Sequence, residues 1–174
     1  MCYHTGIAAA ARKIDMFKPD WLFDTVFEIT PDFLIKEGVK AVIFDIDDTV
    51  VPHGSEKPDE KCLSFIEGLK SAGIKVAYIS NNPLERDPFF TPLFSLARKP
   101  SKKGYLALAN GFGLPPESCL VAGDQLFTDV RGGIKAGMKT IKVKPITGFK
   151  DVPIAIKRVL ERPLLRKYEK EKKR

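Results

Sequence analysis

The sequence predicts an α/β fold in which a mainly parallel, five-stranded sheet lies between layers of helices. Short apolar runs of strand length alternate along the chain with longer stretches whose apolar residues have helical spacing. This alternation favours a parallel sheet covered on both faces, as in a Rossmann-like three-layer sandwich. The chain has 174 residues, a hydrophobic fraction of 44% and a charged fraction of 29%, which suit one globular domain with a sizeable core.

Five apolar runs are the predicted strands. The first, KAVIFD, is a continuous apolar run up to its final carboxylate, and the fourth, SCLVAGD, also ends in an aspartate. The third is the shortest and has the weakest pattern. The predicted strands cover 40–45, 74–80, 93–96, 118–124 and 138–144.

The predicted helices lie before and between these strands. The stretch DEKCLSFIEGLKSAG has apolar residues at helical spacing, with Pro58 just before it and Gly73 at its end, as helix punctuation predicts. Pro88 and Pro92 limit the short helix that follows, and Ser101 is the expected cap of the next one. The last helix is expected despite its glycines. The predicted helices cover 31–38, 59–73, 84–91, 101–113 and 126–137.

The chain divides into three expected parts: an N-terminal segment over 1–17, a domain over 18–150 and a basic C-terminal tail over 151–174. No apolar run approaches the ~20 residues of a membrane span. The N-terminus lacks the apolar core of a secretory signal, although a fragment of a transit peptide stays open as an alternative. The three cysteines are odd in number and lack metal spacing, which suits a reducing compartment and a cytoplasmic protein.

Positive charge is concentrated at the C-terminal end. The net charge is +7, and residues 157–174 hold nine Lys or Arg against three Glu. A basic tail on a nearly neutral domain indicates an anionic partner, either a membrane surface or nucleic acid. The alternative is a solvated helix end without a partner. Apolar and basic residues interleave in this tail, and Pro163 is expected to break any single helix.

Polar residues follow three of the predicted strands at the ends where ligands bind in such a sheet. The sequences are Asp45-Ile-Asp-Asp-Thr, Ser80-Asn-Asn and Gly-Asp124. In an extended backbone Asp45 and Asp47 point the same way, and like charges held together require a cation or a proton. All-oxygen ligation favours Mg²⁺, and Lys99 adds a cation suited to phosphate. Taken singly, each stretch is also ordinary turn chemistry, and Lys99 an ordinary surface lysine.

DIDDTV, SNN, ARKP and GDQLFTD, in this order and at these spacings, resemble the four motifs of the haloacid dehalogenase (HAD) superfamily of phosphotransferases. The resemblance covers residues 42–129. Over about 18–146, the stretches KPDWLFDTVFEITPDFLIKEGVKAVIFD and GDQLFTDVRGG resemble more closely the subfamily IIIA branch called YqeG. That branch is related to the phosphatidylglycerophosphate phosphatases of bacteria and mitochondria.

The resemblance implies a role for each matching residue of the first two motifs. Asp45 would be the nucleophile that forms an aspartyl-phosphate. Asp47 would protonate the leaving group and then activate water. Thr49 would hold the loop, while Ser80 and Asn81 would bind the phosphoryl oxygens.

The last two motifs would complete the site. Lys99 would neutralise charge on the nucleophile and on the phosphate, and so act in both catalysis and substrate binding. Mg²⁺ would be bound by Asp45, the backbone carbonyl of Asp47 and Asp124. Asp129 would make a contact behind these ligands or within its helical turn.

Three positions stay open. Asp48 stands where these relatives often have Asn, so it either attracts a second counter-ion or faces solvent. The segment from Ser80 to Lys99 is shorter than the branch leads us to expect, which affects the assignment of Lys99 most. His53 is expected to be a loop residue, with a substrate contact as the alternative.

Short intervals between the motifs predict an enzyme without a large cap domain. Nine residues separate Thr49 from Asp59, where the next helix begins. An open site suits a substrate with a large remainder, such as a lipid, although an oligomer closing over a small metabolite stays open as an alternative. We expect hydrolysis of phosphatidylglycerophosphate at the inner membrane face, with the basic tail on anionic lipid.

Two other functions stay open as alternatives to the lipid phosphatase. One is a phosphatase of a soluble sugar phosphate or nucleotide, and the other a non-catalytic binding protein that keeps the fold. Nucleic acid is not the expected partner, because the sequence has no aromatic stacking motif.

Overall fold

The computed structural model describes residues 16–55, 57–82, 88–147 and 152–172, without the side chains of 152–157 and 172. The expected segment 1–17 therefore lies almost wholly outside the described residues. So does most of the expected short helix 84–91, whose described part contains a turn.

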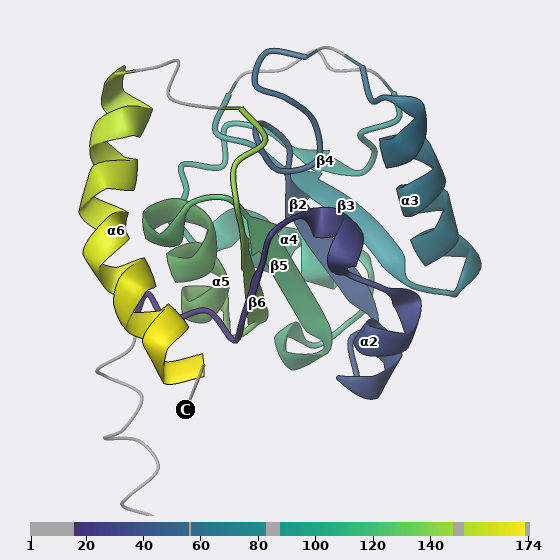
Figure 1. Ribbon diagram of the computed structural model, residues 1–174. Helices are drawn as coiled ribbons and strands as arrows, with labels where there is room; N and C mark the ends of the chain where they lie inside the picture. Colours follow the sequence, from purple (N-terminus) through teal and green to yellow (C-terminus); the bar gives the residue numbers. More distant parts are fainter. Residues whose placement is uncertain (1–15, 56, 83–87, 148–151, 173–174) are drawn as a thin grey trace, which may run out of the picture.

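A parallel sheet of six strands forms the centre of the molecule, in the order β1-β6-β5-β2-β3-β4 (Figure 1). All five expected strands are present, and every pairing is parallel. The expected count of five misses β1, which pairs with β6 at one edge. With three residues, β1 is too short to show a strand period. The strands are β1 Trp21–Phe23, β2 Ala41–Asp45, β3 Lys75–Ile79, β4 Leu93–Phe94, β5 Cys119–Gly123 and β6 Lys139–Val143.

Helices cover both faces of the sheet. The helices are α2 Pro31–Lys36, α3 Glu60–Ser71, α4 Lys103–Gly111, α5 Arg131–Ala136 and α6 Val152–Lys172. Strand side chains alternate between the faces: Val42 and Phe44 pack with α2 and α3, whereas Ala41 and Ile43 pack with α4 and α5. This confirms the predicted three-layer α/β sandwich, and the described residues contain no large cap domain.

The start of α3 agrees with the sequence, whereas the start of α4 differs. The side chain of Asp59 accepts a hydrogen bond from the Cys62 N–H at 2.8 Å and so caps α3. Helix α4 begins later than expected. Its N-cap is Lys102, and the Ser101 hydroxyl accepts only a long bond of 3.4 Å from the Lys103 N–H.

The expected helix 126–137 consists of a π-helical turn, η3 (Leu126–Val130), followed by α5. Its glycines have a packing role. A Cβ on Gly132 would lie 2.4 Å from the ring of Tyr105, and one on Gly133 would lie 2.6 Å from Cγ2 of Thr140. Glycine therefore lets α5 lie directly against α4 and β6.

The C-terminal helix α6 corrects one prediction, because it runs through Pro163 unbroken. A proline inside a helix frees the carbonyl four residues earlier, here that of Val159. Both residues are exposed, so water can hydrogen-bond to that carbonyl. Tyr168 is buried and packs with Leu126 and Val130, so α6 is joined to the domain along the η3 turn.

No helix within the described ranges is both long and apolar enough to cross a bilayer.

Candidate active site

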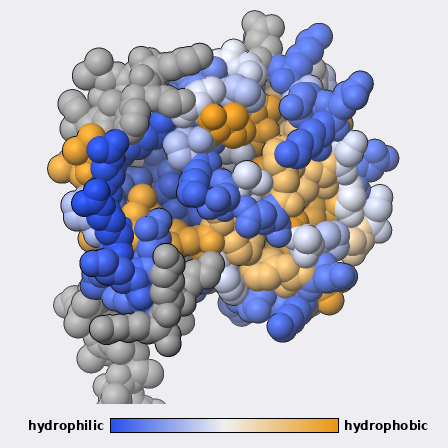
Figure 2. Space-filling view, viewed as in Figure 1, coloured by the Kyte–Doolittle hydropathy of each residue, from blue (hydrophilic) through white to orange (hydrophobic). Residues whose placement is uncertain are grey.

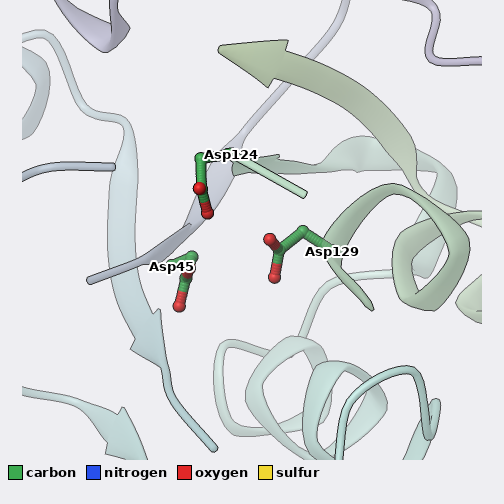
Figure 3. A group of neighbouring side chains, drawn as sticks. All are labelled: Asp45, Asp124 and Asp129. Atoms are coloured by element: carbon green, nitrogen blue, oxygen red, sulfur yellow. The ribbon is translucent and has the colours of Figure 1, made fainter. Parts of the chain in front are cut away.

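Three carboxylates from separate elements meet at the carboxyl edge of the sheet. Asp45 ends β2, Asp124 follows β5, and Asp129 comes from the η3 turn (Figure 3). Each offers an oxygen, and these oxygens all lie within 4.8 Å of one another. All three residues are buried, with at most 5% of their surface exposed. Asp129 makes the expected contact within its helical turn, where its Oδ2 accepts from the backbone N–H of Gln125 at 3.1 Å, and it also belongs to this group.

Lys99 compensates part of this negative charge. Its Nζ lies 2.6 Å from Oδ1 of Asp45 and 2.7 Å from Oδ1 of Asp129. The backbone N–H of Lys99 donates to Oδ1 of Asn81 at 2.6 Å, which fixes the loop that carries the lysine. The short interval after Ser80 therefore still brings Lys99 to the site.

The charge state of Lys99 follows from these neighbours. Burial would lower the pKa of its ammonium group, but the carboxylates of Asp129 and Asp45 outweigh burial and raise the pKa above its ordinary value. Lys99 is therefore a buried cation at neutral pH.

The carboxylates of Asp45 and Asp124 are only partly compensated. Burial raises the pKa of Asp45 well above its ordinary value, and Asp129 and Asp124 add to this rise while Lys99 opposes it. The pKa of Asp124 is also raised, mainly by burial and to a lesser extent by the neighbouring carboxylate of Asp129. A further cation would keep both groups ionised at neutral pH.

The donor set fits a divalent cation. Oδ1 of Asp124 is buried and has no hydrogen-bond partner within the described part of the chain. The surrounding donors are carboxylate oxygens, the type that Mg²⁺ prefers. An unsatisfied buried oxygen beside two further carboxylates is the feature that a bound cation would explain.

Asp47 follows Asp45 by two residues, and its side chain is slightly more exposed. Its side chain is 13% exposed, whereas that of Asp45 is 7% exposed. Oδ2 accepts a hydrogen bond from Nδ2 of Asn82 at 3.1 Å, and Nδ1 of His53 lies 3.8 Å from Oδ1. Ile46 between the two aspartates is fully buried in the core, as the alternation predicts. The contact with Asn82 was not foreseen from the sequence.

Two hydroxyl groups occupy buried positions in the expected motifs. Ser80 is 2% exposed, and its oxygen accepts from the backbone N–H of Asn82 at 3.1 Å, so the hydroxyl proton can be donated elsewhere. The Thr49 hydroxyl is buried without a hydrogen-bond partner among the residues described. Asn81, by contrast, is exposed and holds the loop of Lys99.

Arg158 supplies the counter-ion of Asp48, which decides the alternative that the sequence left open. Nη2 of Arg158 donates to Oδ2 of Asp48 at 2.7 Å and to Oδ2 of Asp124 at 2.8 Å. Thr147 donates to Oδ1 of Asp48 from its backbone N–H at 3.0 Å and also from its hydroxyl. Burial would raise the pKa of Asp48, but these hydrogen bonds outweigh it and lower the pKa. No sequence signal distinguishes Arg158 from the other basic residues of the tail.

Comparisons with known proteins identify the family of this chain. A HAD-hydrolase-like family model matches residues 96–154, about a third of the chain. "Probable phosphatase YqeG" of Bacillus subtilis (strain 168) is 35% identical over 154 residues, covering 86% of this chain and 90% of that protein. The chain therefore belongs to the YqeG-like family of HAD phosphatases.

Solved structures that are similar to this chain are more distant. An uncharacterized protein from Listeria monocytogenes serotype 4b shares 16% identity over 68% of this chain and 97% of its own, with a TM-score of 0.48. A HAD-superfamily hydrolase, subfamily IA, from Geobacter sulfurreducens PCA shares 15% identity over 64% of this chain and 90% of its own, with a TM-score of 0.43. At these TM-scores, the likeness adds nothing to the family assignment.

Proposed function

We propose that this phosphatase hydrolyses phosphatidylglycerophosphate to phosphatidylglycerol, with Asp45 as nucleophile and Mg²⁺ as cofactor. The observation that carries the chemistry is the position of Asp45. Its carboxylate is buried at the sheet edge, 2.6 Å from the Lys99 ammonium and grouped with Asp124 and Asp129. Phosphoryl transfer depends mainly on positioning and on charge stabilisation, and this arrangement supplies both.

Asp45 and Asp47 carry the two half-reactions. An oxygen of Asp45 forms a bond to phosphorus while the ester P–O bond breaks, which gives an aspartyl-phosphate. Asp47 donates its proton to the leaving alcohol oxygen and then takes a proton from the water that attacks phosphorus. That attack releases inorganic phosphate and restores the Asp45 carboxylate. The greater exposure of Asp47 supports a role in contact with the leaving group and with water.

The remaining residues bind the phosphoryl group. Lys99 neutralises its charge, and the Ser80 hydroxyl donates to one of its oxygens. Thr49 has a buried hydroxyl that can support the loop after β2, which carries Asp47, once substrate is bound. Asn81 contributes by holding the loop of Lys99.

Asp45, Asp124, Asp129 and the backbone carbonyl of Asp47 are the groups that would hold Mg²⁺. The ion would neutralise the repulsion between the carboxylates and the incoming phosphate, as metal ions do in phosphoryl transfer.

The lipid substrate is supported by the family resemblance, by the short intervals between the motifs and by the surface of α6. Val159 and Leu160 on α6 are 51% and 60% exposed, directly next to Arg158 of the site. Arg166 and Lys170 are exposed further along the helix. Figure 2 shows a small apolar group at the left edge of this face, beside a column of hydrophilic side chains. Apolar residues flanked by basic ones suit an anionic lipid surface, so we propose a cytoplasmic protein peripheral at the inner membrane face.

Phosphate release from phosphatidylglycerophosphate in mixed micelles tests the substrate, with and without Mg²⁺ and with Asp45→Asn as the control. Release that requires both Mg²⁺ and Asp45 is the expected result. Release only from soluble sugar phosphates or nucleotides, in a parallel screen, would replace the lipid by a small metabolite.

Membrane binding is tested by sedimentation with vesicles that contain phosphatidylglycerol. Removing 157–174 would also remove buried Arg158, so point variants are cleaner. Arg166→Gln with Lys170→Gln should reduce binding, because each basic residue near such a surface contributes about 1 kcal/mol. Lys36→Gln, which removes an exposed lysine in the last turn of α2, is the control. Equal binding of all variants would contradict the docking surface.

A further inference from the structure

One guanidinium group joins α6 to two aspartates of the site. Arg158 is 8% exposed, and its Nη2 lies between Oδ2 of Asp48 and Oδ2 of Asp124, at 2.7 and 2.8 Å. Nη1 makes a longer bond of 3.4 Å to the carbonyl oxygen of Thr147. These bonds link the last helix of the chain with the loops that follow β2, β5 and β6.

A second residue of α6 holds the same region. Glu161 lies one helical turn beyond Arg158 and is 1% exposed. Its Oε1 accepts from the backbone N–H of Phe127 at 3.1 Å, between Asp124 and Asp129 in the chain. Two buried side chains of α6, Arg158 and Glu161, therefore contact the segment from Asp124 to Asp129.

We propose that Arg158 is a positioning residue for the cation site, an inference that rests on the proposed function. The guanidinium occupies Oδ2 of Asp124 and thereby fixes the orientation of that carboxylate. Oδ1, which is buried and has no hydrogen-bond partner in the described ranges, is left for the cation. The same guanidinium neutralises Asp48, so this carboxylate does not compete for the metal.

The proposal makes α6 a structural part of the active site. Residues that orient a metal ligand affect the metal affinity even though they do not touch the ion, and their loss typically weakens binding about 10- to 100-fold. Arg158 touches neither substrate nor metal in this account, so its loss should change the metal affinity more than the chemistry at saturating metal.

The test is a calorimetric titration of metal-free protein with Mg²⁺, using Arg158→Met and Arg158→Lys. Arg166→Met is the matched control, because Arg166 is an exposed arginine of the same helix. We expect Mg²⁺ affinity to fall about 10- to 100-fold in Arg158→Met. The Mg²⁺ affinity of Arg158→Lys should fall less, because lysine keeps the charge but lacks the planar, forked donors of the guanidinium. The control should bind Mg²⁺ as the wild type does.

Activity as a function of Mg²⁺ gives the second readout. In Arg158→Met, the Mg²⁺ concentration for half-maximal activity should rise by the same factor, with most of kcat recovered at saturation. A folded Arg158→Met with wild-type affinity would overturn the proposal and leave the proposed function untouched. Wild-type protein that neither binds Mg²⁺ nor releases phosphate would overturn both. Should Arg158→Met fail to fold, Arg158→Lys decides: wild-type affinity overturns the proposal and weakened affinity supports it.

Discussion

Replacing Lys99 with Met is the change with the largest effect that the site geometry predicts. The substitution keeps the length and the apolar stem of the side chain but removes its charge. Two buried carboxylates, Asp45 and Asp129, then lose the ammonium that lies 2.6 and 2.7 Å from them. The lysine side chain is 4% exposed, so water cannot readily take its place.

The magnitude follows from this burial. Removing one partner of a buried ion pair costs about 3–5 kcal/mol of unfolding free energy. Asp45 already has a raised pKa and takes up a proton more readily once Lys99 is gone, which relieves part of the loss. We therefore expect the lower end, about 3 kcal/mol near pH 8. For a chain of this size, that corresponds to a fall in Tm of about 6–12 °C.

The pH dependence has a definite sign. A carboxyl group whose pKa is raised in the folded protein binds more protons there than in the unfolded chain, so its stabilising contribution is present at low pH and lost as the pH rises. The difference between Lys99→Met and wild type should therefore shrink from pH 8 to pH 5. Activity should fall about 10²- to 10³-fold, as for other charge-stabilising groups.

The assay is thermal and urea unfolding in EDTA at both pH values. Lys102→Met, an exposed lysine three residues away, is the matched control and should unfold like the wild type. Equal stability of Lys99→Met and Lys102→Met at pH 8 would refute the account of the site as a charge-balanced cluster.

Three further predictions concern stability and metal binding. Gly123→Ala would place a Cβ 2.4 Å from Cβ of Asp129, so urea unfolding should show a loss of about 3 kcal/mol; Gly111→Ala, which meets nothing within 4 Å, should show none. Burial raises the pKa of Glu161 to about 7 from an ordinary 4.5, so its contribution favours the folded state at low pH and weakens as the pH rises through this window. Glu161→Gln should therefore be more stable than wild type at pH 8 and equal to it near pH 4.5. The difference at pH 8 should reach up to about 3 kcal/mol, because each unit of pKa shift corresponds to about 1.4 kcal/mol. Greater stability of the variant at both pH values would contradict burial of the Glu161 charge as the cause. Because the pKa of Asp45 is raised, protons compete with the cation for its carboxylate. Calorimetric Mg²⁺ affinity should therefore be weaker at pH 5 than at pH 8, and a pH-independent affinity would exclude Asp45 as a ligand.

The central part of the fold was predictable because its signals are local. Residues 41–44 of β2 are apolar on both faces, and the buried position of this strand between two others explains that pattern. From the order of the motifs we expected Asp45, Lys99 and Asp124 at one edge of the sheet, and the structure places them there. Lys99 reaches the site even though the segment before it is short.

The features that escaped prediction depend on tertiary contacts. Strand β1 has three residues at the sheet edge and too little sequence to show a period. Pro163 is tolerated in α6 because the carbonyl that it frees faces water. The position of Asp129 among the carboxylates depends on the π-helical turn, which no residue pattern in the sequence indicates. Arg158 could not be separated from its basic neighbours, because only the docking of α6 turns it inward.

Trapping the phosphorylated protein tests the central claim most directly. Wild type, Asp45→Asn and Asp47→Asn are mixed with Mg²⁺ and phosphatidylglycerophosphate or acetyl phosphate, quenched in acid and analysed by peptide mass spectrometry. The account predicts a hydroxylamine-labile phosphoryl group on Asp45 that accumulates in Asp47→Asn, which lacks the base for water attack, and is absent from Asp45→Asn. Phosphate release by Asp45→Asn at the wild-type rate, or a phosphoryl group on Ser80 or His53 instead, would contradict it.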